Sequence, residues 1–116
     1  MFRFLLVALS ISSLLFAEEK KTHRVYLLEN EKVKIWKTLI MPNQPLKMHR
    51  HECDRVIVGL KGGTLIKIEK TGETSKLVFE NNKAYWLPKD PPNTYHADIN
   101  ESNEPIEVIV IELKQD

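Results

Sequence analysis

Residues 47–63, KMHRHECDRVIVGLKGG, carry most of the information about the fold, because a cluster of polar side chains leads into an apolar run. Two histidines one residue apart, His49 and His51, precede a mixed charged segment. The run RVIVGL follows and ends at Gly62-Gly63. A compact apolar run closed by a glycine turn is typical of a buried β-strand. The stretch therefore predicts a strand with two imidazoles at its polar N-terminal end.

The chain after residue 23 continues in the same manner and has no helical period. Runs rich in β-branched and aromatic residues are separated by Gly, Asn and Pro: HRVYLLEN (23–30), EKVKIWKTLIMP (31–42), TLIKIEK (64–70), TSKLVFE (74–80), KAYWL (83–87) and PIEVIVIEL (105–113). Strand-length runs at this spacing predict an all-β sandwich or barrel. Segment 88–105 differs, because its four prolines bar a regular central strand through the whole of it.

The first 17 residues have the layout of a secretory signal peptide. Arg3 supplies a positive start, 13 apolar or small residues run from Phe4 to Phe16, and Ala17 precedes a charged segment. A membrane span needs about 20 residues. We therefore expect cleavage after Ala17, export to the periplasm or the extracellular space, and no stable membrane insertion of the mature chain. An uncleaved anchor is the alternative, because Leu15 is larger than the residue preferred three positions before the cut.

Composition excludes some classes of partner for the mature chain. Without residues 1–17 the 116-residue chain keeps 99 residues, and since Arg3 is the only charge lost, 16 of the 17 bases face 16 acids. Nucleic acids and anionic membrane surfaces attract clustered positive charge, so neither is expected as a partner. A domain of this size has a modest core, and we expect it to form a homodimer. Cys53 is the single cysteine, so the chain has no internal disulfide framework.

The histidines suggest a metal site. His23 lies near the mature amino terminus, where we expect it to be exposed. His49 and His51 share parity, so on a strand both would point to one face of the sheet. Paired imidazoles are common ligands of iron, copper, nickel and zinc. The alternative is a solvent-exposed pair on an edge strand.

The order of these residues resembles the first motif of the cupin superfamily, G-x5-H-x-H-x3,4-E-x6-G. The matching positions, with every spacing kept, are Asn43, His49, His51, Arg55 and Gly62. The second cupin motif, G-x5-P-x-G-x2-H-x3-N, is matched in two halves. These are Asn82-x5-Pro88 and Pro91-x-Asn93-x2-His96-x3-Asn100, which join if the loop carries three extra residues near Lys89-Asp90-Pro91. The resemblance, to a small single-domain cupin of the type-2 kind, covers about residues 40–113.

This resemblance implies a double-stranded β-helix, the jelly-roll β-barrel of cupins. The barrel core would comprise residues 40–113, and N-terminal strands would occupy residues 18–39. The resemblance also implies that His49 and His51, from one strand, meet His96 from a distant strand. Together they would hold a divalent transition metal, which is Fe, Mn, Ni, Cu or Zn.

Arg55 departs from the cupin pattern, because it occupies the position of the glutamate ligand. A guanidinium stays protonated and offers no lone pair to a metal. Three interpretations stay open for Arg55. It binds a carboxylate ligand in the pocket, or it forms a structural ion pair with Glu52 or Asp54, or it marks a metal site that has been lost.

Three neighbouring residues are further candidates for ligand binding. Cys53 has the parity of the histidines, so it is either a cavity-facing thiol or a small buried hydrophobe. Tyr85 and Tyr95 flank the second motif, where aromatic residues form core or pocket wall more often than catalytic groups. Asp54 has the opposite parity to the histidines and would reach the site only through a bulge.

The sequence thus favours an exported small cupin that binds a divalent metal through three histidines and a small, anionic ligand through Arg55. It assigns neither a reaction nor enzymatic activity, because the fold hosts many chemistries. The alternative is a non-catalytic ligand-binding or structural jelly roll with a degenerate metal site.

Overall fold

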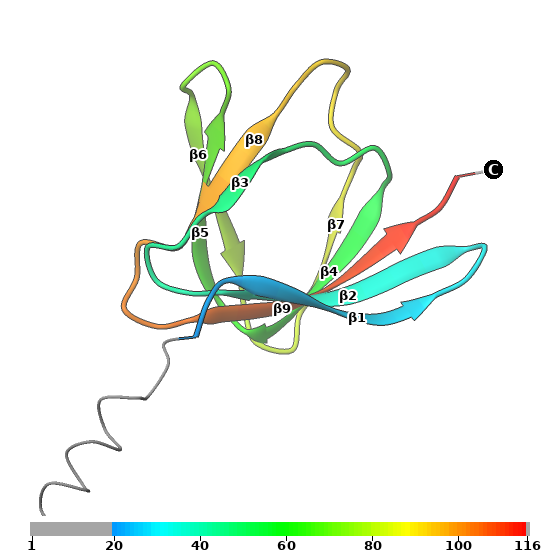
Figure 1. Cartoon of the computed structure of the whole chain (residues 1–116), viewed down its shortest axis with the longest axis horizontal. Coiled ribbons are helices and arrows are strands. Elements are labelled where there is room, and N and C mark those ends of the chain that lie inside the picture. The colour runs from blue at the N-terminus through cyan, green and yellow to red at the C-terminus, as the bar shows by residue number, and fades with distance from the viewer. Residues whose placement is uncertain (1–19, 116) are drawn as a thin grey trace, which may run out of the picture.

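The computed structural model describes residues 20–115, which form nine β-strands and no helix (Figure 1). In chain order the strands are β1 (His23–Glu29), β2 (Val33–Ile40), β3 (Leu46–His49), β4 (Arg55–Lys61), β5 (Gly63–Glu69), β6 (Thr74–Phe79), β7 (Ala84–Leu87), β8 (His96–Ile99) and β9 (Ile106–Leu113). Accordingly, this part of the chain has no helix able to cross a membrane. The predicted signal peptide, residues 1–17, lies outside the described residues. The all-β prediction is confirmed.

The strands form two antiparallel sheets that face each other (Figure 1). The five-stranded sheet has the order β1-β2-β9-β4-β7, and the four-stranded sheet has the order β3-β8-β5-β6. Most neighbours in the sheets are distant in sequence, as in the pairing of β2 and β4 with β9. The jelly-roll prediction is confirmed, although within residues 20–115 the two sheets are not closed into one barrel.

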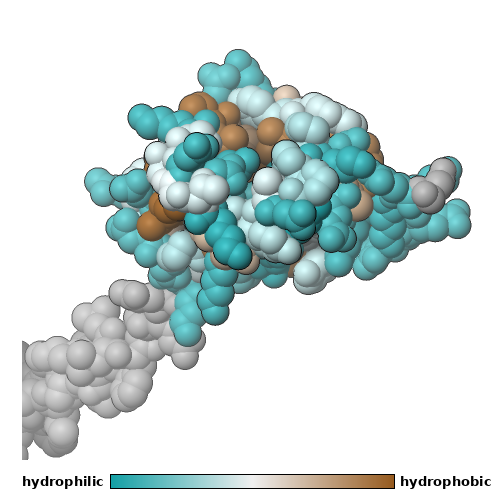
Figure 2. Space-filling model, turned by 90° about the horizontal axis from the view of Figure 1, so that it is seen from above, coloured by the Kyte–Doolittle hydropathy of each residue, from teal (hydrophilic) through white to brown (hydrophobic). Residues whose placement is uncertain are grey.

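The hydrophobic core lies between the sheets. Its buried side chains are Trp36, Ile40, Ile57, Leu65, Phe79, Ile106, Val108 and Val110. In β4 and β9 buried residues alternate with more exposed ones, as expected when one face of a strand packs inward. Seen from above, hydrophilic residues cover most of the surface and hydrophobic residues form small groups (Figure 2).

Asparagines take the place of glycines at three positions of the cupin motifs. Asn43, Asn82 and Asn93 have φ values of 57°, 62° and 62°, in the left-handed region. Asparagine tolerates this conformation better than other residues that carry a β-carbon. The motif glycine that is retained, Gly62, sits where a β-carbon would collide with the carbonyl oxygen of Phe79. The backbone thus supports the motif alignment at all four positions.

The prediction that His49 and His51 lie on one strand is wrong. Strand β3 ends at His49, and His51 lies in the loop that crosses to Arg55 at the start of β4. Since β3 and β4 belong to different sheets, the run RVIVGL does not carry the histidines. The proline-rich segment does contain a strand, but β8 is only four residues long and fits between Pro92 and Pro105.

Asn100 anchors the chain just after β8 through hydrogen bonds of its side chain. Its side chain is fully buried, and its amide donates to the carbonyl oxygens of Ile40 at 3.1 Å and Glu104 at 2.7 Å. Its side-chain oxygen accepts hydrogen bonds from the backbone N–H of Ser102 at 3.0 Å and the Ser102 hydroxyl at 2.7 Å. One side chain thereby joins the end of β2 to the turn before β9.

We expect Asn100→Ala to lower the free energy of unfolding by about 2–3 kcal/mol, because buried carbonyls lose their donors. Urea denaturation followed by circular dichroism measures this loss. Asn103→Ala, an exposed change in the same turn, is the matched control and should shift stability by less than about 0.5 kcal/mol. Equal effects of the two changes would contradict this account of Asn100.

Candidate metal site

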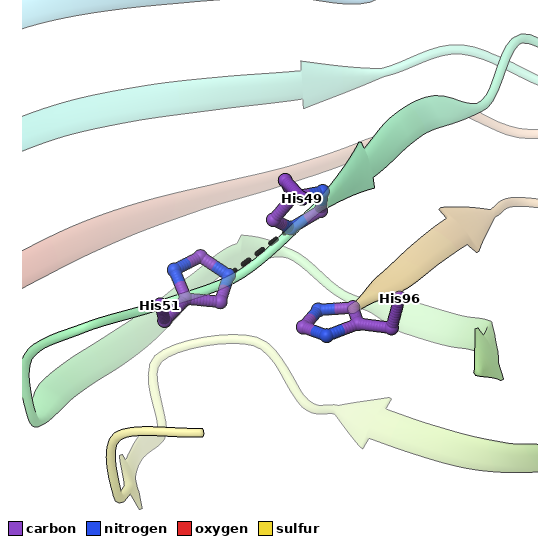
Figure 3. Close-up of side chains that lie close together, drawn as sticks. All are labelled: His49, His51 and His96. Atoms are coloured by element: carbon purple, nitrogen blue, oxygen red, sulfur yellow. Dashed lines mark hydrogen bonds between the residues drawn. The ribbon is translucent and has the colours of Figure 1, made fainter. Parts of the chain in front are cut away.

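Three histidines from separate places in the chain face one another between the two sheets (Figure 3). His49 ends β3 and His96 begins β8, and the two residues are directly opposite in the antiparallel pairing of these strands. His51 reaches the same place from the loop after β3. The predicted convergence of residues 49, 51 and 96 is therefore present, although only two of them lie on strands.

The distances between the imidazoles suit a shared metal ion. One ring nitrogen from each histidine can be chosen so that all three lie within 4.8 Å of one another. Nε2 of His49 lies 3.1 Å from Nε2 of His51. Two imidazole nitrogens on one tetrahedral zinc, each about 2.0–2.1 Å from it, would be about 3.3 Å apart. The rings thus need little movement to bind one ion.

A neighbouring carbonyl group orients one of the rings, that of His49. Nδ1 of His49 lies 2.5 Å from the carbonyl oxygen of Lys47, which only an N–H at that position can satisfy. The Nε2 lone pair of His49 therefore points into the site. Nδ1 of His96 lies 3.6 Å from a carboxylate oxygen of Asp90 and its Nε2 lies 3.6 Å from Asp98, both beyond hydrogen-bonding distance. A hydrogen-bonded carbonyl such as that of Lys47 fixes the tautomer of a metal-binding histidine.

His51 is held by a second loop, residues 88–91. The backbone N–H of His51 donates to a carboxylate oxygen of Asp90 at 2.7 Å, and the N–H of Asp90 donates to the carbonyl oxygen of His51 at 2.8 Å. We call this pair of loops, with the hydrogen bonds between them, the loop clasp. Its other bonds run from Lys89 N–H to Asp54 at 2.8 Å, from Arg50 to the carbonyl of Pro91 at 2.9 Å and from Arg55 to the carbonyl of Pro88 at 3.3 Å.

The loop clasp explains the three extra residues inferred for the second motif. Lys89, Asp90 and Pro91 are the residues that interrupt the motif spacing, and all three bond to the loop of the first motif. The insertion therefore has a structural role: it fixes the backbone of a histidine that no strand supports.

Burial disfavours the protonated form of two of the imidazoles, those of His51 and His96. It lowers the pKa of His51 to about 3, and the nearby Arg55 guanidinium lowers it further in the same direction. Burial also lowers the pKa of His96, partly offset by the carboxylate of Asp98. Burial alone would raise the pKa of Asp90, but the N–H of His51 and the surrounding positive groups outweigh it and lower that pKa. Neutral imidazoles offer the lone pairs that metal binding requires.

Asp98 is a fourth polar residue at the site, and sequence reasoning missed it. One of its carboxylate oxygens lies 3.6 Å from Nε2 of His49 and 3.6 Å from Nε2 of His96. The side chain is buried, which raises its pKa. The available signal was parity, because Asp98 comes two residues after His96 and on a strand must point to the same side.

Arg55 lies at the site and does not point away. It is 6% exposed and lines a cavity of about 50 Å³ together with the three histidines and Asp98. Within residues 20–115, its guanidinium has no carboxylate within the 4.0 Å of an ion pair; Glu52 pairs with Arg50 instead, at 3.7 Å. Burial lowers the pKa of Arg55, and four surrounding carboxylates counteract this effect. This geometry favours the interpretation of Arg55 as a binding group for an anion.

The other candidates lie outside this cluster. Cys53 is half-buried against the C-terminal strand, where burial and then Glu112 raise the pKa of its thiol. Tyr85 packs edge-on against Phe79 and its hydroxyl accepts a hydrogen bond from the N–H of Glu80 at 2.8 Å, so it extends the core. Tyr95 is 39% exposed and lies near the ammonium of Lys70.

The residues present fit a divalent transition metal. Three imidazole nitrogens lie within 4.8 Å of one another, and a carboxylate oxygen lies 3.6 Å from two of them. The second oxygen of Asp98 is buried and has no hydrogen-bond partner among the described residues, as expected beside a cation site. Nitrogen and oxygen donors of this kind suit iron, copper, nickel, manganese or zinc without selecting one of them.

Comparisons with known proteins agree with the motifs. The family model described as auxin binding protein matches residues 23–114. Among solved structures, a cupin domain from Bordetella pertussis has 23% identity and a TM-score of 0.72, covering 85% of this chain and 99% of that chain. An RmlC-like cupin family protein with a double-stranded β-helix fold from Methanocaldococcus jannaschii has 16% identity and a TM-score of 0.62, covering 83% of each chain.

A polyketide cyclase from Streptomyces resistomycificus is also similar, with 17% identity and a TM-score of 0.60, covering 83% of this chain and 67% of that chain. At these identities the solved structures establish the fold alone. The resemblance to cupins in the motif residues is confirmed.

Proposed function

The chain belongs to the auxin binding protein family of cupin domains, and from this premise we propose that it is a small-molecule-binding metalloprotein. His49, His51 and His96 hold a divalent transition metal, and Arg55 binds a small anionic ligand beside it. The observation that carries the proposal is the convergence of three imidazoles on one point in a cavity that Arg55 also lines. The family description supports a small molecule as the class of ligand.

The chain's own residues would prepare the site for this role. The carbonyl of Lys47 orients the ring of His49, and the loop clasp fixes His51. A bound metal would supply Lewis acidity or redox chemistry. The reaction stays unassigned, because the cupin fold by itself selects none.

The size and charge of the site support a small anionic ligand. The cavity of about 50 Å³ admits little more than an ion and a few atoms. A larger cavity of about 160 Å³ adjoins it and is lined by three basic residues, Arg55, Lys67 and Lys89, together with His96 and Asp90. A carboxylate entering there would meet the guanidinium of Arg55, which favours planar oxyanions.

Metal binding is tested by elemental analysis of protein purified without a histidine tag. We expect about one metal ion per chain in the wild type and less than about a tenth of that in His49→Ala and His96→Ala, because each loses a ligand. His23→Ala is the matched control, since His23 lies at the exposed edge strand β1. Equally low metal in wild type and variants would favour the alternative, a jelly roll with a degenerate site.

The role of Arg55 is tested with oxalate as the probe anion on metal-loaded protein. We expect Arg55→Met to weaken oxalate binding by about 10- to 100-fold, since a charge-assisted contact contributes about 1.5–3 kcal/mol. Isothermal titration calorimetry measures the affinity, and metal content should stay that of the wild type. Lys76→Met, which removes an exposed positive charge on β6, is the control. Unchanged oxalate affinity in Arg55→Met would contradict an anion-binding role.

We also propose that the protein is exported and acts as a homodimer. Export rests on residues 1–17 of the sequence. Dimerisation is supported by β1, an edge strand of the five-stranded sheet whose residues are all exposed. Four successive apolar side chains of this strand, Val25, Tyr26, Leu27 and Leu28, are between 42% and 62% exposed. An exposed apolar edge strand is a ready surface for pairing with a second copy.

One preparation tests both parts of this proposal. In protein recovered from outside the cytoplasm, amino-terminal sequencing should begin at Glu18, and light scattering should give twice the mass of one mature chain. Leu28→Lys should shift the mass towards the monomer, because it places a charge on the edge strand, whereas Val78→Lys on β6 should not. A monomeric wild type, or a start at Met1, would refute the corresponding half.

A further inference from the structure

We propose that Asp98 is the fourth metal ligand, so that the acidic ligand absent from position 55 is supplied by strand β8. This inference rests on the proposed metal function, which needs only the three histidines. It concerns a residue that the cupin motifs leave unassigned, since the second motif marks His96 and Asn100 and passes over the residues between them.

Strand geometry brings Asp98 to the site. His96 and Asp98 are two residues apart on β8, so their side chains leave the same face of the sheet. The strand lies between β3 and β5, which places Asp98 opposite Leu46 on one side and Lys67 on the other. The carboxylate is therefore held by an inner strand of the four-stranded sheet.

The position of the carboxylate oxygen matches that of a ligand. It is 3.6 Å from Nε2 of His49 and 3.6 Å from Nε2 of His96, and the hydrogen bond of His49 Nδ1 to the carbonyl oxygen of Lys47 leaves Nε2 of His49 free to bind a metal. Donor atoms about 2.0–2.2 Å from one tetrahedral ion are separated by about 3.3–3.5 Å. A small rotation of the carboxylate would complete a four-donor set.

Within residues 20–115, the carboxylate of Asp98 forms no ion pair with a lysine or an arginine and lies near the imidazoles of His49 and His96 alone among the ion-pair contacts. Asp98 is 5% exposed, and its second oxygen has no hydrogen-bond partner among residues 20–115. The facing cation, Lys67, pairs with Glu69 at 3.1 Å, and neither Lys67 nor Arg55 forms an ion pair with Asp98 in the described part of the chain. Buried carboxylates are normally paired or coordinate metals. A metal ion held by the three histidines would provide the positive charge that this carboxylate lacks.

Arg55 and Asp98 together give the site one basic and one acidic side chain with separate roles. If a carboxylate coordinates the ion from β8, the position at the start of β4 is free for a group with another role. The guanidinium there lines both the cavity of the histidines and the adjoining basic cavity. In this view the acidic ligand comes from β8 in the four-stranded sheet, and an anion-binding group occupies the usual position of that ligand at the start of β4 in the five-stranded sheet.

The test compares zinc affinity and the absorption spectrum of the Co²⁺ form in the wild type, Asp98→Asn, Asp98→His and Asp90→Asn. We expect Asp98→Asn to weaken zinc binding by more than about 100-fold and to move the Co²⁺ bands, because the coordination set changes. Asp98→His supplies a new donor and should restore affinity to within about tenfold of the wild type. Asp90→Asn removes a similarly buried charge that faces the outer nitrogen, Nδ1, of His96. This change should weaken zinc binding by at most about 10- to 100-fold and leave the Co²⁺ bands where they are in the wild type.

Wild-type affinity and unchanged Co²⁺ bands in Asp98→Asn would overturn the assignment while leaving the three-histidine site intact. If the wild type does not bind zinc, the proposed metal function is overturned, and this inference with it. Should Asp98→Asn fail to fold, a crystal structure of the zinc-loaded wild type decides the question. An Asp98 oxygen about 2.0–2.2 Å from the zinc supports the assignment, and one beyond about 3 Å overturns it.

Discussion

The antiparallel pairing of β3 with β8 is the constraint on which the site depends. It sets His49 directly opposite His96, although 46 residues of other strands and loops separate them. Cross-strand partners in an antiparallel pair are only about 4.5–5.5 Å apart, so the register alone brings two imidazoles into contact. A shift of one residue would turn one of the two rings to the opposite face. Asn100, anchored just after β8, helps to hold this register.

The third histidine depends on a different kind of support. His51 has left β3 and is fixed by backbone hydrogen bonds to Asp90, in a loop lengthened relative to the cupin motif. The same carboxylate faces Nδ1 of His96. Asp90 thus links the loops of the two motifs and lies beside two of the three histidines, His51 and His96. The site therefore depends both on the pairing of β3 with β8 and on the hydrogen bonds of the loop clasp.

Much of this arrangement was predictable, and the failures have specific causes. The motif spacings identified the three histidines, and the asparagines at glycine positions were correctly aligned, as their left-handed backbone confirms. The strand parity of His51 was wrong, because alternation holds only while a strand continues and β3 ends two residues earlier. The rule of alternation also applies to Asp98, but the motif marks only His96 and Asn100 on this strand, so Asp98 was not predicted. The jelly roll was predicted correctly, whereas no local run encodes whether its two sheets hydrogen-bond to each other.

Local alternation, spacing and residue chemistry were enough to predict the strand class, the imidazole donors and the arginine at the glutamate position. The positions of the charges became evident from the fold: Arg55 is buried beside the histidines without an ion pair among residues 20–115, and Asp98 faces two of the imidazole nitrogens. The reason is physical. The surroundings of a side chain depend on strands paired across long separations in sequence, and no local pattern fixes which charges those pairings bring together.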